Sequence, residues 1–310
     1  MQFKRLAATV CFAIVLAVPL SALPRSPEDF RVALDAVLDV ERALPFDADP
    51  GPPLKEAFAN NFGQVSARTL DQVSDDDLKA YFSASYLLAF HTKDLGDLAL
   101  VQAAFEALAT RGLERPFDVK MLYSQYVAHR AFELARSLAA RYPEVEVEAL
   151  PRFAPIEGEF HSPTVLELRD DGIVSRVPAG LPDRGPYVVV AAHPLCHFSE
   201  NAIRAIRQDP QVAGLFAGRT LWLMPQDGHM NLEDVRDWNT EFPDYAMRWA
   251  YQTSDWPMIK RWATPNFYFY LDGELVDTVI GWPPEGQRDA LLAAFAKIGV
   301  VPEAADQRSR

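Results

Sequence analysis

The sequence of 310 residues predicts an all-α N-terminal domain and a C-terminal α/β domain. Apolar residues recur at helical spacing from about residue 26 to residue 143. Prolines and alternating Val and Glu residues then break this pattern as far as residue 162. After the break, β-branched runs alternate with helical stretches, which is typical of an α/β sheet. We therefore predict a helical domain over residues 23–143, a linker over 144–162 and an α/β domain over 163–300.

The two ends of the chain lie outside these domains. Lys4 and Arg5 precede an apolar run, and a proline and small residues follow as far as Ala22, which is the pattern of a secretory signal peptide over residues 1–22. An uncleaved membrane anchor is the alternative, because the apolar stretch extends to residue 23. The polar residues 301–310 are expected to be disordered. We expect a periplasmic or secreted protein with no membrane contact beyond its first segment.

Composition restricts the partners and the cysteine chemistry. The net charge of −13 argues against binding to nucleic acid or to an anionic membrane. The two cysteines are Cys11, inside the apolar N-terminal run, and Cys196. A processed chain therefore has no internal disulfide, and its one thiol is either buried and inert or present to react.

Within the helical domain, start and stop signals separate successive helices. Ser74 and the acidic residues after it predict a helix start, and Pro116 opens another helix. Residues 45–53 are rich in Pro, Asp and Gly and predict a loop. Residues 131–143 are loosely similar to the second helix of a tetratricopeptide repeat, although no repeat period is present. This repeat-like module predicts a protein partner.

The α/β domain is expected to follow one order of elements. Its segments are a hairpin over 164–177, a strand over 187–192, a helix over 198–207, a strand over 220–224, a mixed segment over 231–260, a hairpin after Pro265 and a helix over 287–298.

Two of these segments carry the functional signal. Cys196 follows the strand over 187–192 and a short turn, and it opens a helix whose exposed N–H groups favour a thiolate. Thr264 and Pro265 lead into the last hairpin. Together the two segments resemble the thioredoxin superfamily, in which a Cys-x-x-Cys helix start faces a cis-proline loop. The early hairpin and the long insert before Pro265 are similar to the TlpA-like branch of extracytoplasmic thiol-disulfide oxidoreductases.

The resemblance covers residues 163–300 and implies a thioredoxin-like domain whose motif reads Cys-x-x-Ser. Ser199 occupies the position of the second cysteine, and a hydroxyl cannot expel a mixed disulfide from Cys196. With one thiol, Cys196 can still carry out thiol-disulfide exchange, isomerise a disulfide, or reduce a sulfenic acid with the help of an external thiol. Ser199 is one turn along the helix and can donate to the thiolate. A reactive thiol without catalysis and an inert relic are the alternatives for Cys196.

Neighbouring residues add candidate roles. His197 can stabilise the thiolate when it is protonated, or it faces solvent. His193 is a candidate proton shuttle, or it ends a strand. His193, Cys196 and His197 also suggest a metal, but no fourth ligand has suitable spacing, so we expect no metal and no other cofactor.

Thr264 and Pro265 are the candidate substrate-docking residues. If Pro265 is cis, Thr264 can offer main-chain groups to an extended substrate; otherwise Pro265 only begins an edge strand. The leading hypothesis is an exported enzyme that carries out monothiol thiol-disulfide exchange or isomerisation on client proteins bearing disulfides or oxidised thiols. The alternative is a non-catalytic thioredoxin-fold binding or assembly factor that uses its helical module.

Overall fold

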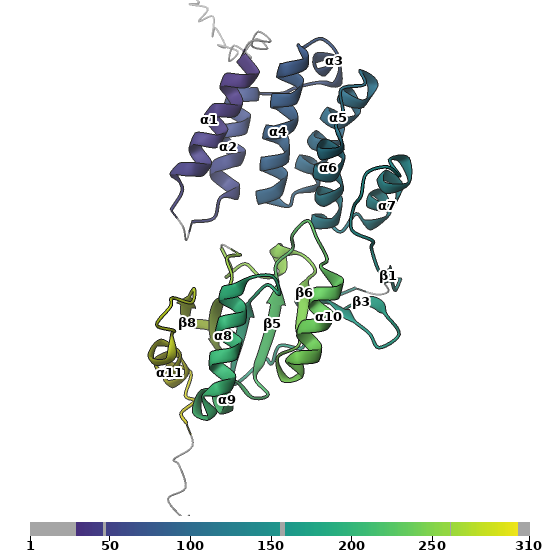
Figure 1. Cartoon of the computed structure of the whole chain (residues 1–310). Helices are drawn as coiled ribbons and strands as arrows, with labels where there is room; N and C mark the ends of the chain where they lie inside the picture. The colour runs from purple at the N-terminus through teal and green to yellow at the C-terminus, as the bar shows by residue number, and fades with distance from the viewer. Residues whose placement is uncertain (1–28, 46–47, 156–158, 261, 303–310) are drawn as a thin grey trace, which may run out of the picture.

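The computed structural model describes residues 29–45, 48–155, 159–260 and 262–302. The expected signal segment (1–22) and most of the expected tail (301–310) lie outside these residues. Within them, a helical N-terminal domain precedes a mixed α/β domain, as the sequence predicts (Figure 1). In the same residues, no helix is both long and apolar enough to cross a bilayer.

The helical domain is built from neighbouring helices that pack in pairs, α1 on α2, α4 on α5 and α6 on α7. Its helices are α1 (Asp29–Ala43), α2 (Gly51–Phe62), α3 (Ala67–Leu70), α4 (Asp75–Thr92), α5 (Leu95–Thr110), α6 (Pro116–Ala128) and α7 (Phe132–Arg141). Aromatic rings fill the space between α1, α2 and α4, where Phe30, Phe62 and Tyr81 are all buried. This apolar packing holds the first three long helices together.

Local signals explain most of the helix starts. The Ser74 side chain accepts a hydrogen bond from the Asp77 N–H, and Asp94 accepts one from Gly96, so each caps a helix start. Pro116 lies in the first turn of α6, as predicted. The loop predicted over 45–53 is wrong at its end, because α2 already begins at Gly51. Its prolines occupy the first turn, where a missing N–H costs no hydrogen bond and the fixed φ suits a helix.

The α/β domain has one eight-stranded sheet among the described residues, in the order β1-β3-β2-β6-β5-β4-β7-β8. The strands are β1 (Arg152–Phe153), β2 (Thr164–Leu168), β3 (Ile173–Pro178), β4 (Pro186–Ala191), β5 (Thr220–Met224), β6 (Met247–Ala250), β7 (Asn266–Leu271) and β8 (Glu274–Ile280). The helices are α8 (His197–Gln208), α9 (Pro210–Phe216), α10 (Leu232–Glu241) and α11 (Arg288–Lys297).

Strand pairing gives this domain a thioredoxin-like fold. β4 is central, lies parallel to β5 and antiparallel to β7, and leads directly into α8. β7 and β8 form the last hairpin, and α11 follows it. Strand β6 lies parallel to β5 and comes from the segment that the sequence showed only as mixed.

The two faces of the sheet are covered differently. Apolar side chains of α8, α9, α10 and α11 join the main core on one face, and α8 and α10 lie over that face in Figure 1. On the other face, Trp256 and Ile259 from the loop between β6 and β7 cover Val189, Leu223 and other strand residues. This loop therefore crosses the sheet and ends at Pro265, beside the start of α8.

The helical domain packs on the edge of the sheet where β4, β5 and β6 end. The guanidinium of Arg130 donates from Nε to the Tyr251 carbonyl oxygen over 3.0 Å and also to the Ala250 carbonyl. Gln226 donates to the Ala128 carbonyl oxygen at 2.6 Å and accepts from the Thr253 N–H at 2.7 Å. These buried contacts join the domains at the edge where ligands bind in open α/β sheets.

Candidate thiol site

Cys196 is the N-cap residue of α8, in an extended backbone conformation directly before the helix. Five of the six residues of β4 are buried, so the strand holds the turn that carries Cys196 firmly against the core. Its Sγ lies 3.4 Å from the carbonyl oxygen of Thr264. The thiol is half-buried, and it is the one free cysteine of the residues that the structure describes.

The surroundings of Cys196 lower the pKa of its thiol. Burial acts against this by raising the pKa, but hydrogen bonds from the Thr264 side chain, the Ser199 N–H and hydroxyl, and the Phe198 N–H outweigh it. Contact with the Thr264 carbonyl oxygen favours the protonated thiol. The net lowering of the Cys196 pKa therefore comes from the hydrogen-bond donors and not from this carbonyl. The lowered pKa agrees with the prediction from the helix start, and main-chain donors supply part of the effect.

Ser199 is fully buried beneath Cys196. Its Oγ accepts a hydrogen bond from the His193 N–H at 3.3 Å, and its hydroxyl also stabilises the Cys196 thiolate. The serine thus connects the end of β4 to the thiol helix. It occupies the predicted position, and its predicted role in tuning the thiol stays a prediction.

Thr264 and Pro265 meet the thiol from the other side of the cleft. The peptide bond between them is cis, and Pro265 is buried at the start of β7. The Pro265 carbonyl accepts from the Gly281 N–H at 2.9 Å, which fixes the loop to the last hairpin. Cys196, Ser199 and Thr264 are therefore brought together, although they come from segments far apart in the sequence.

His193 lies beside this group and pairs with Asp227. Its Nδ1 accepts the Leu195 N–H at 3.1 Å, so a neutral ring carries its proton on Nε2. Nε2 is 3.2 Å from an Asp227 carboxylate oxygen. An imidazole held by a carboxylate in this way is a suitable proton carrier, so the position of His193 is compatible with its predicted role.

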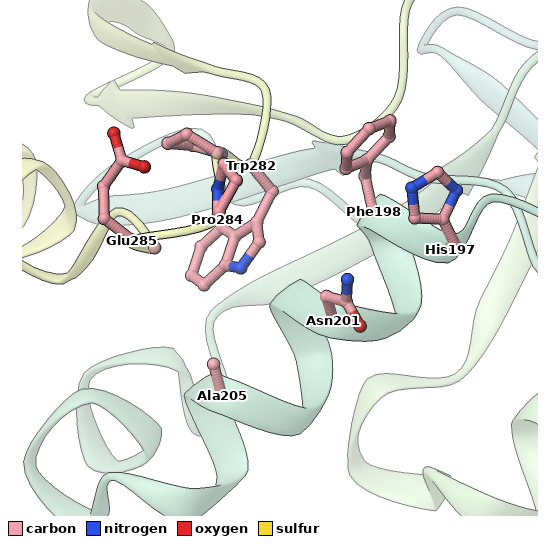
Figure 2. A pocket seen from close by; sticks show the side chains of 9 residues that line it. His197, Phe198, Asn201, Ala205, Trp282, Pro284 and Glu285 are labelled. Atoms are coloured by element: carbon pink, nitrogen blue, oxygen red, sulfur yellow. The ribbon is translucent and has the colours of Figure 1, made fainter.

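His197 faces a different hollow. Its ring is exposed and packs on the Phe198 ring, with 3.8 Å between the centroids. Both residues line a groove of about 480 Å³ between α8 and the loop that carries Trp282, Pro284 and Glu285 (Figure 2). The imidazole makes none of the contacts that lower the Cys196 pKa, so its predicted role gets no support from its position and stays a prediction.

Cys196 lines a larger cleft between the two domains, with a volume of about 1050 Å³. From the helical domain come the end of α4, with Phe90 and Lys93, and the start of α2. From the sheet domain come Asp227 and the loop that ends at Thr264. The thiol therefore opens into a space that neither domain encloses alone.

Asp227, Lys93 and Phe90 line the cleft but were not predicted from the sequence as site residues. Asp227 follows the end of β5, and an acidic residue after a buried parallel strand was a usable signal for it. Lys93 ends α4 in the left-handed conformation, with φ of 53°, and its ammonium donates to the Phe90 carbonyl oxygen. Nothing in the local sequence of α4 connects these two residues with a thiol about a hundred positions away.

No family model matches the chain, and no curated protein matches it. Among solved structures, a thioredoxin-like protein from Bacteroides caccae is similar at 14% identity, over 92% of this chain and 99% of that chain, with a TM-score of 0.31. The thioredoxin-like fold of the C-terminal domain is evident from the strand order, the thiol at the start of α8 and the cis-proline loop.

Proposed function

We propose that this protein carries out thiol-disulfide exchange through Cys196 on extracytoplasmic client proteins. The observation that carries the proposal is the position of Sγ, at a helix start and 3.4 Å from the carbonyl of Thr264, with donors that lower its pKa. A thiolate attacks disulfides, whereas a thiol does not. The hydrogen-bond donors around Sγ support a nucleophile rather than an inert buried cysteine.

The exchange step between Cys196 and a client disulfide needs no external oxidant or reductant. The Cys196 thiolate attacks one sulfur of a client disulfide, a new S–S bond forms to Cys196, and the client's second sulfur leaves as a thiolate. His193 in its protonated, imidazolium form, held by Asp227, is the proposed source of a proton for that leaving thiolate, and the ring is left neutral after the transfer. Ser199 cannot expel the client, so release requires attack by a thiol of the client or by a free thiol. When the client's own second thiol makes the attack, the outcome is isomerisation.

The docking part of the proposal rests on Thr264. Its backbone lies next to Sγ in the cis-proline loop, where an extended client segment can hydrogen-bond to main-chain groups. The hairpin of β2 and β3 before the thiol strand and the long insert before Pro265 support the TlpA-like branch. Export through residues 1–22 and a partner for the helical domain remain parts of the proposal that rest on the sequence alone.

Purification without reductant tests the proposed function. Because Ser199 takes the place of a resolving thiol, client proteins should remain covalently attached to Cys196 and be released by dithiothreitol. Cys196→Ala should lose them, and Ser199→Cys should shorten their lifetime and raise disulfide-reductase turnover. Ser137→Cys, at an exposed position on α7, controls for the mere addition of a thiol. Absence of adducts together with an inactive Ser199→Cys variant would refute exchange and leave the non-catalytic binding protein as the better account.

A further inference from the structure

The cleft at Cys196 has walls of two kinds. Trp256, Ile259 and Trp262 form an apolar wall on the sheet side, and Phe90, 40% exposed, faces the cleft from the helical side. The Trp256 indole N–H is buried and has no hydrogen-bond partner among the described residues. At about 1050 Å³ the cleft has the size of a site for a small molecule or a short extended peptide, not for a folded surface.

Two cationic side chains near this cleft, Lys93 and Arg130, are attracted to the same carboxylate, that of Asp227. Among the described residues, neither ends within 4.0 Å of any carboxylate oxygen. Asp227 itself is already in contact with His193. Burial lowers the pKa of Lys93 to about 8 and that of Arg130 to about 10, as expected for cations short of negative partners.

Of the two cations, Lys93 is the one that lines the cleft. Two other lysines and two more carboxylates also line it: Lys55 is paired with Asp94, Lys260 is exposed, and Asp49 lies at the start of α2. A buried or half-buried charge is stable when it is paired, so a ligand with a negative group near Lys93 would supply the partner that the fold leaves out. This preference runs against the net charge of −13, which by itself repels anions.

We infer that the cleft selects disulfides whose carrier also bears a carboxylate, with the carboxylate at Lys93 and the disulfide at Cys196, because both residues line the same cleft. The inference rests on the proposed exchange at Cys196 and names its substrate class. A low-molecular-weight thiol compound and an acidic residue beside a client cysteine both provide this chemistry. The helical domain then acts as half of the substrate site.

The first test compares two aromatic disulfides on the full-length protein, Ellman's reagent, which carries carboxylates, and neutral 4,4′-dithiodipyridine. Lys93→Met should lower the rate with Ellman's reagent by about fivefold and leave the rate with the neutral reagent unchanged. Lys93→Arg should keep the preference. Lys79→Met removes an exposed lysine from the same helix and should change neither rate.

Salt gives a second test that needs no substitution. If the carboxylate is attracted to Lys93, added sodium chloride should slow Ellman's reagent; if the acidic surface dominates, salt should speed it. Faster reaction in salt, or an equal loss of both rates in Lys93→Met, would overturn the inference. A wild-type thiol that reacts with neither reagent would instead refute exchange at Cys196.

A third test asks whether the carboxylate belongs to a low-molecular-weight thiol compound or to an acidic residue beside a client cysteine. Oxidised glutathione and a mixed disulfide of a short peptide with Glu beside Cys should both lose rate in Lys93→Met, and the faster of them in wild type identifies the carrier. The same peptide with Lys in place of Glu is the matched control. If it reacts as fast as the Glu peptide, the inference is wrong.

Discussion

The contact between Gly228 and α6 allows a steric test of how the two domains meet. Gly228 follows β5, next to Asp227, and a Cβ added there would lie 2.7 Å from the Ser124 Cβ and 3.1 Å from the Ser124 carbonyl oxygen. Its φ is outside the left-handed region, so alanine suits the backbone and the substitution tests space alone. Because the nearest atoms belong to a helix, they cannot withdraw as the end of a long side chain could.

The expected cost of Gly228→Ala follows from two opposing terms. Overpacking a close contact costs about 1–3 kcal/mol, whereas the lost freedom of the unfolded chain returns about 0.4–1 kcal/mol. We expect a net loss of about 1–2 kcal/mol in the free energy of unfolding. Urea unfolding followed by tryptophan fluorescence measures this difference.

Two controls make this prediction specific to the interface. Gly214→Ala, where an added Cβ meets nothing within 4 Å, should leave stability unchanged or raise it. Ser124→Gly removes the nearest atom, so Gly228→Ala should cost less in that background than in wild type. Equal stability of Gly228→Ala and Gly214→Ala, or the same cost of Gly228→Ala in both backgrounds, would contradict a steric clash with Ser124.

Three further predictions concern the interface, the thiol and a buried histidine. Gln226→Leu leaves the Ala128 carbonyl and the Thr253 N–H unpaired and should cost about 1–3 kcal/mol of stability in urea unfolding; a neutral result contradicts it. Ser199→Ala removes a donor to the thiolate and should raise the Cys196 pKa, read as alkylation rate against pH, whereas His197→Ala should change it less; the reverse order would restore the role predicted for His197. Burial lowers the pKa of His129, so the unfolded chain takes up a proton first as the pH falls below about 6.5, and stability is lost there. His129→Gln should flatten that part of the stability curve, and an unchanged slope would count against it.

Local sequence was sufficient for much of the fold. The capping residue Ser74, the Asp-Gly turns and the β-branched strand before Cys196 each determine their own element through neighbouring residues. Strand β6 escaped prediction because it has four residues and is defined by pairing with β2 and β5, not by its own pattern. The start of α2 was missed because prolines signal both a loop and the first turn of a helix.

The residues of the candidate site also fall into those that local sequence predicts and those that only the packing of the two domains reveals. Cys196, Ser199 and Thr264 belong to motifs that a sequence displays, and the structure brings them together. Lys93 and Phe90 reach the cleft only because the helical domain packs on the carboxyl edge of the sheet. That packing depends on contacts such as those of Arg130 and Gln226, whose partners are about a hundred positions away. No local pattern contains this information.

The lifetime of a mixed disulfide at Cys196 shows whether the protein carries out monothiol exchange. A cysteine peptide is attached to Cys196 in the purified protein, and its release is followed by mass spectrometry with and without added thiol. We predict that the wild-type adduct persists until a thiol is added, whereas Ser199→Cys releases the peptide on its own, because the introduced thiol forms a disulfide with Cys196. Equal release from both proteins without added thiol would contradict monothiol exchange at this site.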